Sequence, residues 1–192
     1  MQKVLTLKAN YLAEKLGYDV TIITTDQKDN ITYFPLSTNI KLVNLQINFY
    51  DMYNRTPFVL RLWKYLLYMK KYKRLLTQTL HEIKPDITIT LLRKEINFIN
   101  SIKDGSYKIG EIHFDKTHYR VFHHPLIPSI FCRLITYFWK KQLIKKLQLL
   151  DRFIVLTNED RQKWTELESV DFIHNPIDLS DINGLSALDN KT

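Results

Sequence analysis

The sequence predicts an α/β protein built on a Rossmann-like parallel sheet with helices on both faces. Apolar segments of strand length alternate with segments of helical periodicity along most of the chain. The strand segments are continuous apolar runs, which is typical of parallel strands covered on both faces. The composition agrees with this class, because 45% of the 192 residues are hydrophobic and 25% are charged, as in an ordinary globular domain.

The first predicted element is a helix that opens the chain. Val4, Leu7 and Tyr11 recur at helical spacing, and Gly17 follows the last periodic residue, where glycine commonly ends a helix in the left-handed conformation. The segment YDVTIITT, residues 18–25, then predicts a buried strand. Further strands, each bounded by polar or turn residues, are predicted in residues 41–47, 86–92 and 108–114.

Two long basic helices are predicted among these strands. The first begins with Thr56 as the N-cap and Pro57 as the first helical residue, and it ends before Pro85. The second begins near Pro128. Their predicted core-facing stripes are Val59, Leu62, Leu66, Met69, Leu76, Leu80 and Ile83 in the first helix, and Cys132, Ile135, Trp139, Leu143, Leu147 and Leu150 in the second.

The last predicted unit is a strand, a short helix and a second strand. Residues 153–156 form the first strand, and Thr157 is a natural N-cap for the helix that follows. The second strand, residues 170–173, ends at Asn175-Pro176. We therefore predict an incomplete Rossmann-like domain over residues 1–176, followed by a hinge remnant and polar tail over residues 177–192.

Five segments carry a resemblance to a known family. They are KVLTLKANYLAEKLGYDVTIITTDQ, KPDITITL, IKDGSYKIGEIHF, DRFIVLTNEDRQKW and FIHNPID, and they span most of residues 3–178. Together they resemble the N-terminal, acceptor-side domain of the retaining GT-B glycosyltransferases of family 4, of the type that assembles bacterial polysaccharides. The resemblance implies a hexosyl transfer from a nucleotide-sugar donor to a glycan or lipid-linked acceptor, without a further cofactor.

The chain departs from that family at both ends. The family usually begins with a strand and a glycine-rich turn, in the place where this sequence has Met1, Gln2 and Lys3. The resemblance also implies a second Rossmann-like domain, which binds the nucleotide sugar, after Asn175-Pro176. We therefore expect a chain truncated at both ends that lacks its first strand, is poorly stable and is inactive alone, unless a separate chain supplies the donor domain.

Ligands of open α/β sheets bind beyond the carboxyl ends of the strands, and the candidate site residues are chosen there. The richest such segment is EIHFDKTHYR, residues 111–120. By family resemblance, His113 is the candidate catalytic residue that faces the sugar-transfer cleft. The alternative is a solvated loop whose histidine bonds to backbone. The residues that we expect to bind the acceptor are Asp26, Asp115, Lys116, Tyr119, Arg120 and Thr157.

Other chemistries have weaker support in the sequence. The spacing of His113, Asp115 and His118 matches no common zinc site, so no metal site is predicted. The four glycines never cluster, which excludes a dinucleotide fingerprint and a P-loop from this sequence. Cys132 is the single cysteine, so no intrachain disulfide can form, and a reducing cytoplasm fits best.

The net charge of +8 indicates a polyanionic partner. Both long helices mix aromatic and basic residues, which suits either an acidic membrane surface or a core stripe with a solvated basic face. We favour the core stripe, and we keep peripheral contact with the inner membrane face as the open alternative. A non-enzymatic nucleic-acid binder is a further alternative, but the sequence has none of the common nucleic-acid-binding signatures, so we do not favour nucleic acid as a partner.

Overall fold

The computed structural model describes residues 2–26, 33–49, 58–114, 116 and 128–176. These residues fall into two compact units. The first contains residues 2–44 with Asn175 and Pro176, and the second is Leu45–His174 apart from the gaps just given. Each unit holds one parallel sheet together with at least one helix, so the predicted α/β class is confirmed. The described strands form two sheets, one of two strands and one of four.

The first unit consists of α1 (Gln2–Glu14), β1 (Thr21–Thr24) and β2 (Lys41–Asn44). Gly17 has a φ of +69° and ends α1 as predicted, while the Tyr18 amide donates to the Leu12 carbonyl at 3.0 Å. β1 and β2 pair in parallel. The segment before β2 is held to α1 by Asn10, which donates to the Pro35 carbonyl and accepts from the Ser37 amide.

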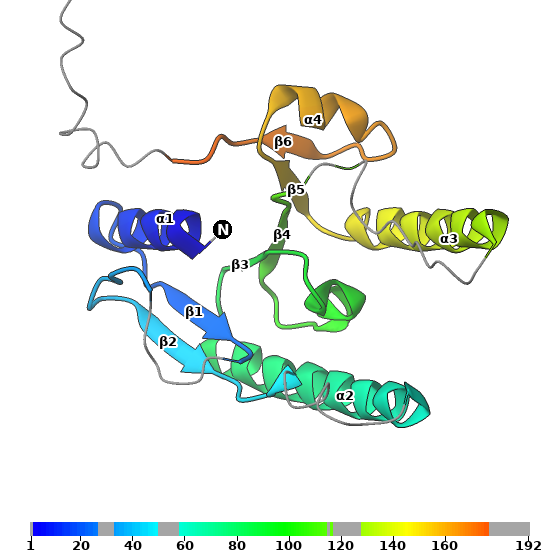
Figure 1. The fold of residues 1–192 in the computed structure, drawn as a ribbon. Coiled ribbons are helices and arrows are strands. Elements are labelled where there is room, and N and C mark those ends of the chain that lie inside the picture. The colour runs from blue at the N-terminus through cyan, green and yellow to red at the C-terminus, as the bar shows by residue number, and fades with distance from the viewer. Residues whose placement is uncertain (1, 27–32, 50–57, 115, 117–127, 177–192) are drawn as a thin grey trace, which may run out of the picture. The chain divides into compact units, whose positions relative to one another are not determined.

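The second unit carries the four-stranded sheet and the two long helices (Figure 1). Its sheet has the order β3-β4-β5-β6, and all three pairings are parallel. Short 3-10 turns, Glu95–Asn97 and Ile99–Ser101, follow β3. The elements are α2 (Phe58–Ile83), β3 (Ile87–Thr90), β4 (Tyr107–Glu111), α3 (Ser129–Leu147), β5 (Arg152–Val155), α4 (Asn158–Lys163) and β6 (Val170–Phe172).

The core of this unit centres on the middle strands. Phe153 and Val155 of β5 are almost fully buried, and the Phe153 ring meets Trp164 edge-on at a centroid distance of 4.9 Å. Gly110 of β4 has its neighbours so close that a Cβ atom there would lie 2.5 Å from Leu150 Cδ1 and 3.0 Å from Leu92 Cδ2. Glycine at this position therefore lets the chain segments on either side of β4 approach each other closely.

The predicted stripes of the two long helices are right at some positions and wrong at others. In α2 the buried residues are Tyr72, Leu76 and Leu80, whereas Leu62 and Leu66 are exposed. In α3 the predicted Cys132, Leu143 and Leu147 are buried, but Trp139 is 44% exposed. Both helices begin with apolar residues on several sides, so spacing alone does not identify the face that packs.

A buried ion pair lies at the amino end of β4. The side chain of Asp104 is fully buried, and that of Lys108 is 9% exposed. Lys108 Nζ donates to Asp104 Oδ1 and to Ser106 Oγ, and Ser106 donates to Asp104 Oδ2 at 2.9 Å. Burial raises the pKa of Asp104, but the hydrogen bonds from Lys108, Ser106 and its own backbone together outweigh it, so the pKa lies below its ordinary value.

We predict that Asp104→Asn lowers the free energy of unfolding by about 3 to 5 kcal/mol, because it leaves the Lys108 cation buried without its counter-charge. Because the pKa of Asp104 is lower in the folded state than in the unfolded state, its ionised form stabilises the protein at pH values above the unfolded-state pKa, which is about 4. The difference in the free energy of unfolding between wild type and Asp104→Asn should therefore be constant near neutral pH and shrink as the pH falls through the folded-state pKa of Asp104. Urea unfolding at pH 7 and at pH 3 measures it.

Asp19→Asn is the matched control for this prediction. Asp19 pairs with Lys41 at 2.9 Å, but both side chains are more than two-thirds exposed. Exposed ion pairs contribute about 0 to 1 kcal/mol, so the control should change stability little. Equal losses in the two variants would contradict the importance of the buried pair.

Candidate functional site

The carboxyl ends of β3, β4, β5 and β6 lie at one edge of the four-stranded sheet, because all four strands run in the same direction. This edge carries side chains that can bind a polar ligand. They come from the turn after β3, the end of β4, the N-cap of α4 and the second residue after β6, and are Arg93, Lys94, Glu111, His113, Thr157 and His174.

The turn after β3 is tightly built around Glu95. Its carboxylate oxygen Oε1 accepts from the Thr90 hydroxyl at 2.7 Å and from the Arg93 amide at 2.9 Å. Leu92 is 2% exposed and has a φ of +54°, a conformation that costs free energy for a residue with a side chain. The strained turn places two cations, Arg93 and Lys94, directly beyond the strand.

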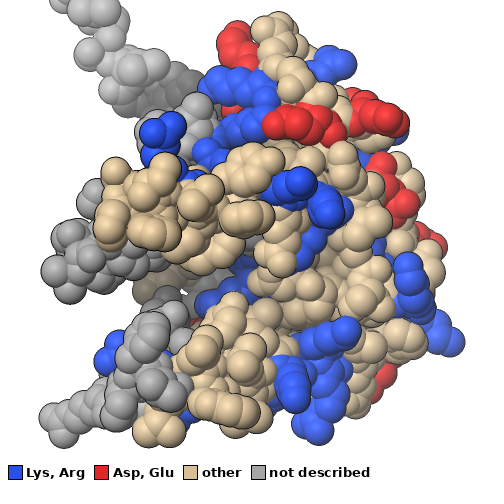
Figure 2. Space-filling view, turned by 90° about the vertical axis from the view of Figure 1, so that its right-hand side faces the viewer, with Lys and Arg blue, Asp and Glu red and all other residues tan. Residues whose placement is uncertain are grey.

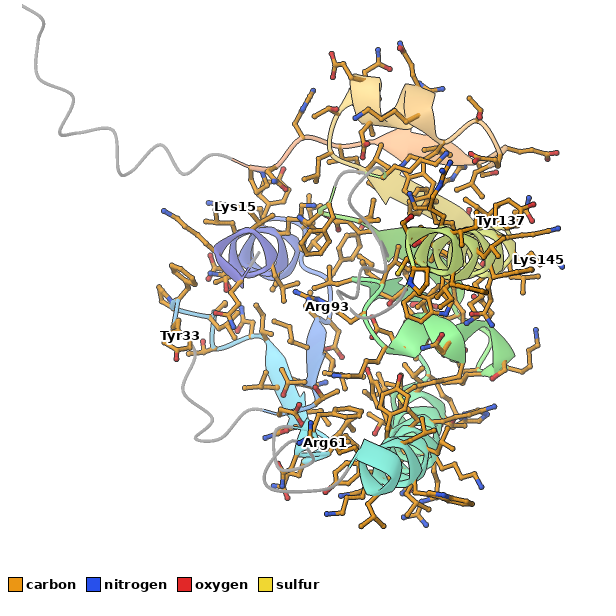
Figure 3. The ribbon with its side chains drawn as sticks, turned by 45° about the vertical axis from the view of Figure 1, so that its right-hand side comes forward. Lys15, Tyr33, Arg61, Arg93, Tyr137 and Lys145 are labelled. Carbon is orange, nitrogen blue, oxygen red and sulfur yellow. The ribbon has the colours of Figure 1, made fainter. Side chains whose placement is uncertain are left out.

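Aromatic rings lie under these two cations. The Arg93 guanidinium is 5.5 Å from the centroid of the Phe114 ring, and Lys94 Nζ is 4.0 Å from that of Phe49. Arg93 is labelled in Figure 3, in the turn that follows β3. Phe114 remains 44% exposed, so this edge of the sheet combines an open ring with positive charge.

His113 is paired with a carboxylate at the end of β4. Its Nε2 lies 3.1 Å from Oε1 of Glu111, and the two side chains are only 9% and 8% exposed. Residues two apart on an extended segment lie on the same face, which brings the two groups together. Glu111 holds and orients the ring.

Sequence reasoning identified His113 but missed Glu111. The available signal was an acidic residue at the end of a predicted buried strand, two positions before the histidine. An acidic side chain is rarely buried without a partner, so this placement alone points to a pair.

Lys116 is bound to the segment that follows α4. Its Nζ donates to Glu166 Oε2 at 2.6 Å and to the Lys163 carbonyl, and it lies 5.0 Å from the centroid of the Trp164 ring. The hydrogen bond from Lys116 lowers the pKa of Glu166 below its ordinary value, with the help of a hydrogen bond from the Glu166 backbone and against the raising effect of burial. The arrangement ties the loop after β4 to the turn after α4.

Thr157 caps α4 as predicted. Its hydroxyl oxygen accepts from the Asp160 amide at 3.1 Å. The neighbouring Glu159 carboxylate accepts from its own backbone amide and from Thr157, and His174 attracts it, so its pKa lies below the ordinary value. Thr157 therefore organises the helix start at the same edge of the sheet as His113.

The remaining predicted residues are distributed as follows. Asp26 follows β1 and belongs to the first unit, whereas His113, Lys116 and Thr157 belong to the second. Asp115, Tyr119 and Arg120 lie outside the described residues. Within the described part of the chain, no three His, Cys, Asp or Glu side chains come together as a metal-binding group.

Comparison with known proteins adds no family to these observations. A scan against protein-family models matches none of them, and a search of curated proteins finds no match. The site must therefore be interpreted from its own chemistry: a carboxylate–histidine pair, two cations over aromatic rings and one exposed ring at a single sheet edge.

We predict that Lys116→Met raises the pKa of Glu166 toward its ordinary value, because the ammonium donor that lowers it is removed. The measurement is a carboxyl carbon NMR titration of Glu166 in wild type and variant. Lys163→Met is the control, since Lys163 pairs with Asp160 on α4 at 3.7 Å. An unchanged Glu166 titration in Lys116→Met would show that the ammonium is not held at this carboxylate in solution.

Proposed function

We propose that the chain is the acceptor-binding half of a retaining GT-B glycosyltransferase, with His113 beside the reacting hydroxyl of the acceptor. The observation that carries the proposal is the Glu111–His113 pair at the carboxyl edge of a parallel sheet, where ligands of open α/β sheets bind. The order of the five resembling segments supports it. The nucleotide sugar would bind to a second Rossmann-like domain, on this polypeptide or on a partner chain.

The chemistry of this edge suits a sugar that carries a phosphate. The His113 ring donates or accepts a hydrogen bond according to its protonation, and a sugar hydroxyl does both. The exposed Phe114 ring offers an apolar surface of the kind common in ligand sites. Arg93 and Lys94 add positive charge for a phosphate group of a lipid-linked acceptor.

We predict that phosphorylated sugars shift the ring NMR signals of His113 and bind at least about tenfold more weakly to His113→Gln, since one charge-assisted hydrogen bond is worth about 1.5 kcal/mol or more. Long-range proton–nitrogen spectra separate the six histidine rings, and His113→Gln assigns the signal. His81→Gln is the control, because the His81 ring bonds to the Thr77 carbonyl on α2. Equal binding by wild type and His113→Gln would refute the assigned role.

A second proposal is peripheral contact with an anionic membrane surface, and the outer faces of α2 and α3 favour it. No described helix is both long and apolar enough to cross a bilayer. On α3, one side of the first ten residues is exposed and apolar. Its members recur at spacings of three, four and seven, and are Ile130, Phe131, Leu134, Tyr137 and Phe138, between 47% and 63% exposed.

The same face of α3 becomes basic toward its C-terminal end. Lys141 and Lys145 lie seven and eleven positions after Leu134, so they continue the outer face, and both are exposed (Figure 3 labels Tyr137 and Lys145). The buried Cys132 and Leu143 lie on the opposite side. An outer face of this kind is typical of helices that lie in a lipid interface.

α2 repeats the pattern. Leu60, Trp63 and Leu67 are exposed on one face, and Lys70 and Arg74 continue it. Both helices begin on the right-hand side of Figure 1. Figure 2 views that side, where Lys and Arg alternate with uncharged residues and most Asp and Glu lie along the upper and right-hand rim. α3 has no acidic residue, and α2 has only Glu82, near its end.

We predict that the protein co-sediments with vesicles containing an anionic lipid, and that Leu134→Ser with Phe138→Ser reduces binding at least about tenfold by removing apolar area from the lipid interface. Lys141→Gln should weaken binding by about fivefold, since a basic residue near such a surface contributes about 1 kcal/mol. Leu149→Ser is the control, because Leu149 is 69% exposed but lies beyond α3.

Two results would count against the membrane proposal. One is co-sedimentation that does not change when the anionic lipid is replaced by a neutral one. The other is equally tight, steeply salt-dependent binding to DNA or RNA that survives the Leu134→Ser and Phe138→Ser changes, which would favour phosphate contacts instead.

A further inference from the structure

We propose that the outer edge of β3 is a docking site for an extended strand of a partner polypeptide, with aliphatic side chains on one face of that strand and small polar side chains on the other. The proposal is independent of the proposed transferase function. It rests on the backbone of β3, on the exposure of its isoleucines and on the bonding of its threonines.

β3 is an edge strand of the four-stranded sheet in the second unit. Among the described residues it pairs with β4 and with no other strand. The Tyr107 amide donates to the Asp86 carbonyl at 2.8 Å, which fixes the alternation of the parallel ladder. The backbone groups of Thr88 and Thr90 therefore face β4, and those of Ile87 and Ile89 face away from it.

The two faces of β3 differ in chemistry. Ile87 and Ile89 lie on one face and are 56% and 51% exposed, which is unusual for isoleucine in a parallel sheet. On the other face, the Thr88 hydroxyl bonds to Ser106 Oγ at 2.7 Å and the Thr90 hydroxyl to Glu95. The isoleucine face thus stays about half exposed although Tyr107 and Ile109 of β4 lie opposite Ile87 and Ile89, and the threonine face is already bonded.

These features define the occupant. Outward-facing amide and carbonyl groups at Ile87 and Ile89 match the ladder of a β-strand and not the surface of a helix. The exposed isoleucines select aliphatic side chains opposite them, and the threonine face selects small polar ones. The strand itself contains no proline, charge or bulge of the kind that normally protects an edge, since Lys84, Pro85 and Asp86 all precede it.

The test uses a fluorescent, lysine-flanked peptide of alternating valine and threonine, because lysine ends avoid nonspecific attraction to a protein of net charge +8. Fluorescence anisotropy should show saturable binding to the wild-type chain. The same peptide with N-methyl groups on successive residues loses its backbone donors and should not bind. Binding of both peptides with equal strength would mean hydrophobic adhesion and would overturn the proposal, as would no binding by either.

A protein variant tests the same edge from the other side. Ile89→Pro removes an outward-facing amide without removing a donor from the β3–β4 ladder, so the fold is retained and peptide binding should weaken about tenfold. Ile89→Val keeps the amide and should bind like wild type. Unchanged peptide binding by Ile89→Pro overturns the proposal. Self-association of the wild-type chain without peptide, seen in sedimentation velocity and abolished by Ile89→Pro, also overturns it, because a second copy of the chain would then be the occupant.

Discussion

The parallel pairing of β4 between β3 and β5 determines where the polar groups of the second unit lie. It brings the ends of three strands to one edge, so that the turn after β3, the Glu111–His113 pair and the N-cap of α4 become neighbours in the same rim. It also places the Asp104–Lys108 ion pair at the opposite end of the same strand. The charged groups that stabilise the fold and the charged groups that can contact a ligand therefore lie at opposite ends of β4.

The parts of the fold that could be predicted from the sequence are those determined by local signals. Helices that begin or end at a capping residue were predicted closely: Gly17 ends α1, Pro128 precedes α3 and Thr157 caps α4. These signals are local, because each acts through the backbone of its immediate neighbours. The positions of the strands were predicted from continuous apolar runs, which are also a local signal.

Features that depend on distant neighbours were not predictable in the same way. Nothing local marks Leu92 for a positive φ, or Lys116 for a contact with Glu166, which is 50 positions away. The buried face of α2 was predicted only in part: Leu76 and Leu80 are buried as expected, but Tyr72 was missed, because apolar residues at the start of the helix surround its axis and only tertiary contacts select the face that packs. His113 was selected by resemblance, and the structure adds the carboxylate that holds it.

The absent side chain of Gly110 has a consequence for how this protein tolerates change. Leu150 and Leu92 occupy the space where a methyl group would be, and Leu92 is the strained residue from which Arg93 extends. A larger residue at Gly110 would displace the side chains of Leu150 and Leu92 together. In a mutational survey, substitutions at Gly110 would then reduce ligand binding as if Gly110 contacted the ligand. The cause would be the volume of the new side chain, because Gly110 has no polar atom beyond its backbone.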